Sequence, residues 1–226
     1  MTNTAAKSRG IPTRKLVVTA MLIAISFAAV LIGRLVPNVA GFLSYDPKDA
    51  IVVIAGFIYG PLTSVIISVI VSLIEMLTIS TTGPYGLIMN VFSTCAFAVP
   101  AALIYKKSRN MKGAVIGLVA GMVSMTVCML LWNYIITPFY MGVDRSMVAG
   151  MLVPTFLPFN LIKSGINLGL ALVLYKPIVS ALRMAHLLPP AQHKPSKVSV
   201  QVGITLISLF VLATFILLFL VFSGTI

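Results

Sequence analysis

One lysine and two asparagines stand inside a mostly apolar stretch, FLPFNLIKSGINLGLALVLY, which runs from Phe156 to Tyr175. On a helix, Asn160, Lys163 and Asn167 have the spacing i, i+3 and i+7, so they share one face. A carboxamide offers a donor and an acceptor to the edge of a heterocycle, and a lysine donates to a carbonyl oxygen or a ring nitrogen. This combination on one helix face predicts a binding site for a small, flat, uncharged polar ligand.

Side chains of the same kind stand near the ends of other apolar stretches. Trp132 and Asn133 open the segment WNYIITPFY, and Glu75 ends the segment SLIE. Aromatic faces stack on a flat ring, and a carboxylate accepts hydrogen bonds from ligand hydroxyl groups. Amides, an amine and carboxylates that gather among Phe, Tyr, Trp and Met therefore favour a single pocket at one end of the helices.

The lysine itself needs an explanation, because burial of a lysine in a bilayer costs about 2.5–3.5 kcal/mol on insertion scales. A lysine in such a place usually faces a cavity, a partner carboxylate or a ligand. The alternative is snorkelling, in which the long stem of Lys163 carries its ammonium to the membrane surface. Since snorkelling needs no asparagines on the same face, Asn160 and Asn167 favour the pocket.

The composition shows what kind of helices position these groups. The chain has 226 residues, of which 59% are hydrophobic and 9% are charged, whereas about a quarter of a soluble domain is charged. Continuous apolar runs of about 20 residues match the length that a helix needs to cross about 30 Å of hydrocarbon. A β-barrel would instead show short alternating segments. We therefore predict an all-α integral membrane protein.

The apolar runs and their breaks predict the order of the elements. Gly60 and Pro61 stop the second run, and STTGPYG and KKSRNMK are typical of connectors. The expected helices cover residues 16–36, 50–60, 62–79, 87–105, 113–136, 159–182 and 198–222. The expected organisation is a basic N-terminus at 1–14, a six-helix substrate-binding domain at 15–183, a linker at 184–197 and an additional transmembrane helix at 198–226.

The basic residues predict the orientation in the membrane. With the N-terminus in the cytoplasm, most of the sixteen lysines and arginines fall in cytoplasmic segments. The outer side then holds the remaining basic residues and all four acids, namely Arg34, Lys48, Arg145, Lys163, Asp46, Asp49, Glu75 and Asp144. Short basic loops that face anionic lipid also account for the net charge of +12 without a nucleic-acid partner. We expect a multi-pass protein of the cell membrane.

Several kinds of catalytic site are missing from the sequence. A GxxxxGK[ST] phosphate loop is absent, so ATP hydrolysis is not expected in this chain. His186 and His193 stand in the predicted linker, far from the polar residues described above, and Cys95 and Cys128 lie in different apolar runs without a CxxC spacing. We expect no enzymatic activity, no metal site and no cofactor.

A set of segments, in a fixed order, resembles a known family. These segments are FLSYDPKDA, GFIYGPL, SLIE with STTGPYGLIMNVFST, IYKKSR, WNYIITPFY, and FLPFNLIKSGIN with LYKP, and together they cover about Lys15 to Arg183. The chain resembles the riboflavin-specific substrate-binding (S) component of energy-coupling factor (ECF) transporters. The resemblance implies a six-helix core with a pocket near the outer face, closed by the loop after the first helix.

The resemblance also implies roles for single residues. Asn133, Asn160 and Lys163 would contact the edge of the flavin ring, Asp49 would face polar atoms of the ligand, and Tyr45 and Phe42 would help to close the pocket. For Glu75, helix packing is the alternative to ligand contact. The complete set of expected substrate-binding residues is Phe42, Tyr45, Asp49, Glu75, Trp132, Asn133, Asn160, Lys163 and Asn167.

Partners follow from the same resemblance. An S component of this kind takes riboflavin from outside and works with a transmembrane coupling subunit (EcfT-type) and two ATPase subunits. Ala20, Ala24 and Ala28 have the spacing i, i+4 and i+8 and form a small-residue stripe on which such a subunit would dock. Packing within the chain is the alternative for this stripe.

Other functions remain open at this point. The chain has the features of an S component for another small molecule, such as FMN, FAD or a different vitamin, with Arg34, Lys48 and Arg145 as candidate phosphate contacts. An integral membrane enzyme acting on lipid or isoprenoid, and a scaffold without a ligand, are further alternatives. The helix at 198–222 departs from the family pattern, and the sequence leaves its packing open.

Overall fold

The structure is a computed structural model that describes residues 12–189 and 198–225. Its elements in chain order are α1 (Thr13–Gly33), α2 (Lys48–Tyr59), α3 (Pro61–Thr78), α4 (Gly83–Ser108), α5 (Met111–Met141), α6 (Arg145–Met151), a π-helical turn η1 (Leu152–Phe156), α7 (Leu157–Met184) and α8 (Val198–Phe222). Within the described ranges the only strand-like pairing is an isolated bridge between Val39 and Leu43. The predicted all-α fold is confirmed.

Among the described residues, six helical segments are long and apolar enough to cross a membrane. They are Thr13–Gly33, Pro61–Thr78, Gly83–Ser108, Met111–Met141, Arg145–Met184 and Thr205–Phe222. The chain is therefore a multi-pass membrane protein. Of the predicted N-terminal segment and linker, residues 1–11 and 190–197, with His193 among them, lie outside the described residues.

The helix predicted at 50–60 is present, but it is shorter than a membrane span. α2 has 12 residues, and at 1.5 Å per residue it is about 18 Å long, compared with about 30 Å of hydrocarbon. Its first nine residues, from Lys48 to Gly56, are buried, and it contacts α1, α3, α4 and α7. α2 is thus a central helix that the longer helices surround.

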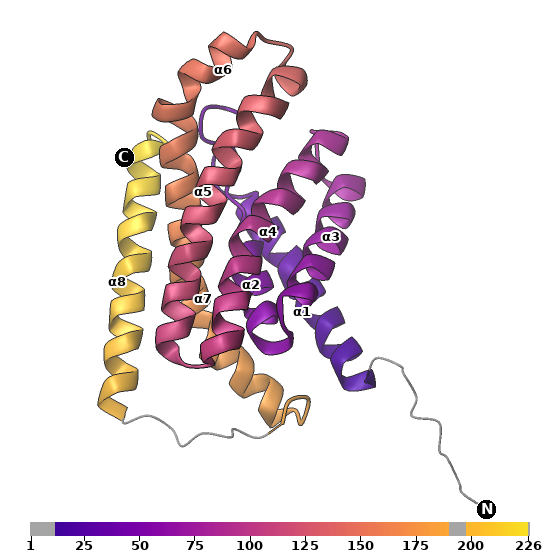
Figure 1. The fold of residues 1–226 in the computed structure, drawn as a ribbon, viewed down its shortest axis with the longest axis vertical. Coiled ribbons are helices and arrows are strands. Elements are labelled where there is room, and N and C mark those ends of the chain that lie inside the picture. Colours follow the sequence, from indigo (N-terminus) through magenta and orange to yellow (C-terminus); the bar gives the residue numbers. More distant parts are fainter. Residues whose placement is uncertain (1–11, 190–197, 226) are drawn as a thin grey trace, which may run out of the picture.

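The longer helices are arranged around α2 with α8 at one edge and α1 and α3 at the other (Figure 1). α4 packs between α3 and α5, and α7 packs between α5 and α8. Glycines allow the closest approaches: a Cβ on Gly121 of α5 would come within 2.3 Å of the Phe97 carbonyl oxygen of α4. α8 therefore packs on the core through α7, which answers the question that the sequence left open.

The loop between α1 and α2, residues 34–47, forms a tight turn. Val39 and Leu43 exchange two backbone hydrogen bonds of 2.9 Å each. Between them Ala40 and Gly41 have φ values of 51° and 80°, which reverse the chain direction. Ser44 Oγ donates a 2.9 Å hydrogen bond to Asn38 Oδ1 and braces the turn from outside. This 34–47 loop covers one end of the helix bundle.

The small-residue stripe on α1 faces outward. Ala20, Ala24 and Ala28 are all exposed in the structure. The opposite side of α1 is the one that packs on the core, with Val18, Leu22, Ser26, Val30 and Gly33 buried. Packing within the chain, the alternative that the sequence left for the stripe, is therefore contradicted.

Candidate ligand-binding site

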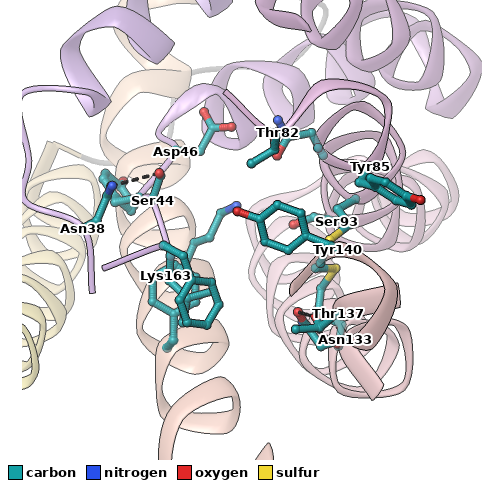
Figure 2. Close-up of a pocket in the computed structure, with 18 of the residues that line it drawn as sticks. Asn38, Ser44, Asp46, Thr82, Tyr85, Ser93, Asn133, Thr137, Tyr140 and Lys163 are labelled. Atoms are coloured by element: carbon teal, nitrogen blue, oxygen red, sulfur yellow. Dashed lines mark hydrogen bonds between the residues drawn. The ribbon is translucent and has the colours of Figure 1, made fainter. Parts of the chain in front are cut away.

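A cavity of about 220 Å³ lies beneath the 34–47 loop. Residues of α1, α3, α4, α5 and α7, together with Thr81 and Thr82 between α3 and α4, contribute the rest of its wall. Figure 2 shows labelled side chains of the loop, α4, α5 and α7 around a common space. Six of the predicted residues line it, namely Phe42, Tyr45, Glu75, Asn133, Asn160 and Lys163. Predicted residues from separate segments of the sequence therefore line the same cavity.

The two asparagines in the wall are fixed by hydrogen bonds within their own helices. Asn133 Nδ2 donates to the Met129 carbonyl oxygen at 2.7 Å, and Asn133 Oδ1 accepts from Thr137 Oγ1 at 3.0 Å. Asn160 Nδ2 donates to the Phe156 carbonyl oxygen at 2.7 Å. Because Asn160 Oδ1 has no hydrogen-bond partner within the described residues, it remains an acceptor for a group that enters the cavity.

Lys163 turns inward, so the snorkelling alternative is contradicted. The residue is 6% exposed, and its Nζ lies 3.9 Å from Asp49 Oδ2. At 3.9 Å the carboxylate of Asp49 neutralises the charge of Lys163, but the two atoms are too far apart for a hydrogen bond. Among the described residues, Asp49 Oδ2 has no hydrogen-bond partner. Thr94 Oγ1 holds the other oxygen, Asp49 Oδ1, at 2.6 Å. The ammonium of Lys163 therefore keeps its N–H donors available to a ligand.

A second charged group, Lys48 at the start of α2, joins the 34–47 loop to α3. Lys48 is completely buried, and its Nζ contacts Asp46 Oδ2 and, at 2.9 Å, Glu75 Oε2. Glu75 Oε1 accepts a 2.7 Å hydrogen bond from Arg34 Nη2, and Glu75 Oε2 accepts one of 3.0 Å from Asn90 Nδ2. This cluster fixes the start of α2, the end of α3 and the 34–47 loop around the cavity.

Charges at the site balance each other. Arg34, Lys48 and Lys163 supply the positive charges, and Asp46, Asp49 and Glu75 supply the negative ones. Burial alone would raise the pKa of the Asp46 carboxyl, but the cations of Lys48 and Lys163 outweigh burial and hold that pKa below its usual value. Asp46 therefore stays ionised beside Lys48, and the site as a whole is neutral.

Three of the predicted residues lie outside the cavity wall. Asp49 stands behind Lys163, as described above. Trp132 stacks on Phe92, with ring centroids 4.2 Å apart and an interplanar angle of 18°. Asn167 binds the loop instead, because its Nδ2 donates to the Asp46 carbonyl oxygen at 3.1 Å and its Oδ1 accepts from the Tyr45 hydroxyl at 3.4 Å.

Aromatic contacts hold the 34–47 loop from the sides. The Phe42 ring meets the edge of Phe156, with 6.0 Å between centroids. The Tyr45 ring lies 5.9 Å from the ring of Phe219 on α8. Both loop residues also line the cavity.

The cavity also includes residues that the sequence analysis did not single out. Asp46, Ser44, Thr82, Tyr85, Ser93, Thr137 and Tyr140 are labelled in Figure 2. Asn90 is a further one. Most of them stand in segments already quoted, SYDPKD, STTGPYG and WNYIITPFY. The quoted segments therefore indicated the correct parts of the chain, but the sequence did not show which of their residues turn toward the cavity.

Comparison with known proteins places this geometry in a family. Residues 14–175 match the family model described as ECF transporter, substrate-specific component. The riboflavin transporter FmnP of Bacillus subtilis (strain 168) is 30% identical over 186 residues, which cover 77% of this chain and 98% of that protein. The riboflavin transporter RibU of Staphylococcus aureus (strain TCH60) is 27% identical over 176 residues, 75% of this chain and 93% of that protein.

A solved structure supports the same conclusion. The S component of a bacterial ECF transporter superimposes with a TM-score of 0.65 at 27% identity, covering 76% of this chain and 98% of that one. The family match spans the helices that build the cavity and ends before α8. The family match, the relatives and the shared fold show that the chain belongs to the family of substrate-specific (S) components of ECF transporters.

Proposed function

We propose that this chain is the riboflavin-binding subunit of an ECF-type importer and that the cavity under the 34–47 loop holds the flavin. Relatives that match over most of this chain are riboflavin transporters. The observation that carries the proposal is the inward-facing Lys163, which lines the cavity together with Asn160 of the same helix and Asn133 of α5. A scaffold function does not explain why these groups are left available.

The groups in the wall match the edge of the flavin ring. That edge carries carbonyl oxygens on both sides of an N–H group. Lys163 Nζ donates to a carbonyl oxygen, and Asn160 Oδ1 accepts from the N–H. Asn133 supplies a further amide on the facing helix. Asp49 acts through Lys163 by holding its ammonium, and Asn167 acts through the loop that it binds.

Ribityl hydroxyl groups would meet the charged end of the cavity. Asp46 and Glu75 line it, and carboxylates accept hydrogen bonds from hydroxyls. Tyr45 and Phe42 would cover the bound flavin from the loop. Trp132 would support the site from behind through its stacking on Phe92. In this arrangement the ring lies toward α5 and α7, and the chain of hydroxyls lies toward α3.

The charge balance favours riboflavin over its phosphate. A phosphate group would need unpaired cations, but Arg34 and Lys48 are paired with Glu75 and Asp46. Arg145, the third candidate contact, is exposed and lies outside the cavity wall. An uncharged ligand therefore fits this neutral site better than FMN or FAD.

Transport would need partners and a defined orientation. The chain would have its N-terminus in the cytoplasm and its cavity toward the outside, and a coupling subunit with two ATPases would supply the energy. The chain itself would carry out no catalysis. The exposed stripe of Ala20, Ala24 and Ala28 would let a helix of the coupling subunit approach α1 closely.

The docking proposal predicts the effect of a larger side chain in the stripe. Ala24→Leu should prevent co-purification with the coupling subunit, because the added atoms keep the partner helix away from α1. Flavin binding by the isolated chain should not change. Ala213→Leu, at an exposed position of α8, is the matched control. If Ala24→Leu co-purifies as well as the wild type, α1 is not the docking surface.

The function is tested by titration of the purified full chain with riboflavin and with FMN. We expect saturable quenching of riboflavin fluorescence at a stoichiometry of one flavin per chain, and weaker binding of FMN. The visible flavin band in protein purified from riboflavin-containing medium is an independent check. Equal or tighter binding of FMN would contradict the charge argument, and absence of binding to either flavin would contradict the function.

A further inference from the structure

The last helix reaches the loop that covers the cavity. Phe219 of α8 is 4% exposed, and its ring centroid is 5.9 Å from that of Tyr45. Phe219 belongs to one apolar cluster with Val39 of the 34–47 loop and with Phe159 and Ile166 of α7. Leu43 packs against the same cluster, so two sides of the turn in the loop rest on α7 and α8.

Close packing keeps α8 in place on α7. A Cβ on Gly165 would come within 2.4–2.5 Å of the Phe215 ring, and a Cβ on Gly169 would lie 2.9 Å from Leu212 Cβ and 3.0 Å from its Cα. Neither glycine has room for a side chain while α8 keeps this position. The helix is therefore fixed laterally against α7, at Gly165 within one helical turn of Lys163 and at Gly169 within two.

Tyr45 connects this contact with the cavity. Its ring touches α8, its hydroxyl donates to Asn167 Oδ1 on α7, and its side chain lines the cavity. Asn167 in turn holds the backbone of Asp46, whose side chain also faces the cavity. A loop movement that opens the cavity on this side must separate Tyr45 from Phe219.

We propose that Phe219 is a positioning residue through which α8 holds the 34–47 loop closed over the ligand. This inference rests on the proposed function, because the ligand is the flavin. The helix lies beyond the residues that match the family, so the contact is an addition to the shared core. Loss of the contact favours the open loop, and an open loop releases its ligand faster.

The first test measures riboflavin release from the full chain by stopped-flow fluorescence. Phe219→Ala should release riboflavin about 2- to 10-fold faster, the range that corresponds to one aromatic pair. Phe219→Leu should restore part of the slow release. Phe210→Ala removes a ring from the same helix at a position that is 74% exposed, and should leave the rate unchanged.

A second variant reaches the same contact from the other side. Gly169→Val forces α8 away from α7 without altering Phe219 or any residue of the cavity wall. It should also accelerate riboflavin release. Unchanged release in both Phe219→Ala and Gly169→Val, with the wild-type amount of folded protein, would overturn the proposal.

A third measurement needs no flavin, so it tests the role of α8 separately from the proposal that the chain binds riboflavin. In a Cys95→Ala/Cys128→Ala background, Leu43→Cys places a thiol in the loop, and its rate of reaction with a maleimide reports how often the loop opens. Phe219→Ala should raise this rate, and Phe210→Ala should not. A raised rate in a chain that binds no flavin would remove the proposed function and keep the role of α8, whereas an unchanged rate would remove that role.

Discussion

The protein has a cavity at each end of its core, and the two differ in how their polar groups are satisfied. The second cavity, about 150 Å³, is lined by Phe57, Tyr105, Tyr175 and neighbouring residues. Its two tyrosine hydroxyls bond to each other at 2.9 Å, and Phe57 packs on Tyr105 with 4.4 Å between centroids. In the cavity under the 34–47 loop, Lys163 Nζ and Asn160 Oδ1 have no such partner among the described residues.

This difference shows that volume alone does not make a binding site. The two tyrosines of the second cavity satisfy each other's hydroxyl groups by one hydrogen bond and stabilise the packing of α2, α4 and α7. The first cavity keeps the donors of Lys163 and the acceptor of Asn160 available at its wall. A ligand that pairs with those groups gains hydrogen bonds there, so the first cavity is the one expected to bind.

The largest effect is expected where charges are most deeply buried. Lys48→Met leaves Asp46 and Glu75 without their shared cation, and breaking a buried ion pair in this way costs about 3–5 kcal/mol of stability. Thermal unfolding in detergent should show a large fall in Tm. Lys112→Met, at an exposed position of α5, is the control and should leave Tm nearly unchanged. A Tm like that of the wild type for Lys48→Met would show that the cluster does not support the site.

A smaller effect on stability, but a direct effect on binding, is expected at Lys163. Lys163→Met should weaken riboflavin binding roughly 10- to 100-fold, which corresponds to one hydrogen bond from a charged donor. Isothermal titration calorimetry measures the change. The double variant Lys163→Met/Asp49→Asn restores the charge balance and should recover the stability lost in Lys163→Met without recovering affinity. If the double variant binds like the wild type, Lys163 only neutralises Asp49 and does not contact the ligand.

The smallest effect is expected at the other end of the molecule. Tyr175→Phe removes the hydrogen bond to Tyr105 and should cost about 1 kcal/mol of stability. Riboflavin affinity should stay the same, since this cavity does not take part in binding. A loss of affinity as large as that of Lys163→Met would mean that the two cavities are not separate in function.

Much of the fold and part of the site could be predicted from the sequence. The long apolar runs predicted the helices, and the helical period predicted that Asn160 and Lys163 share one face. The same period separates Trp132 from Asn133, because adjacent residues on a helix point about 100° apart. Only Asn133 of this pair lines the cavity, so the geometry of a helix already argued against placing both there.

Other features depend on tertiary contacts that no local pattern reveals. Asn167 is two turns from Asn160, about 10 Å along the helix, and at that depth it meets the 34–47 loop instead of the cavity. Lys48 stands in SYDPKD, which has the composition of a solvated loop, yet it is completely buried. Its burial requires Asp46 and Glu75 together, and Glu75 comes from a helix further along the chain.

The most direct test of this account is an experimental structure of the full chain with riboflavin bound. We expect the flavin ring in the cavity under the 34–47 loop, with a ring carbonyl oxygen within hydrogen-bond distance of Lys163 Nζ and the ring N–H directed at Asn160 Oδ1. A flavin bound elsewhere, for example among Phe57, Tyr105 and Tyr175, or one that leaves Lys163 without contact, would contradict the central claim.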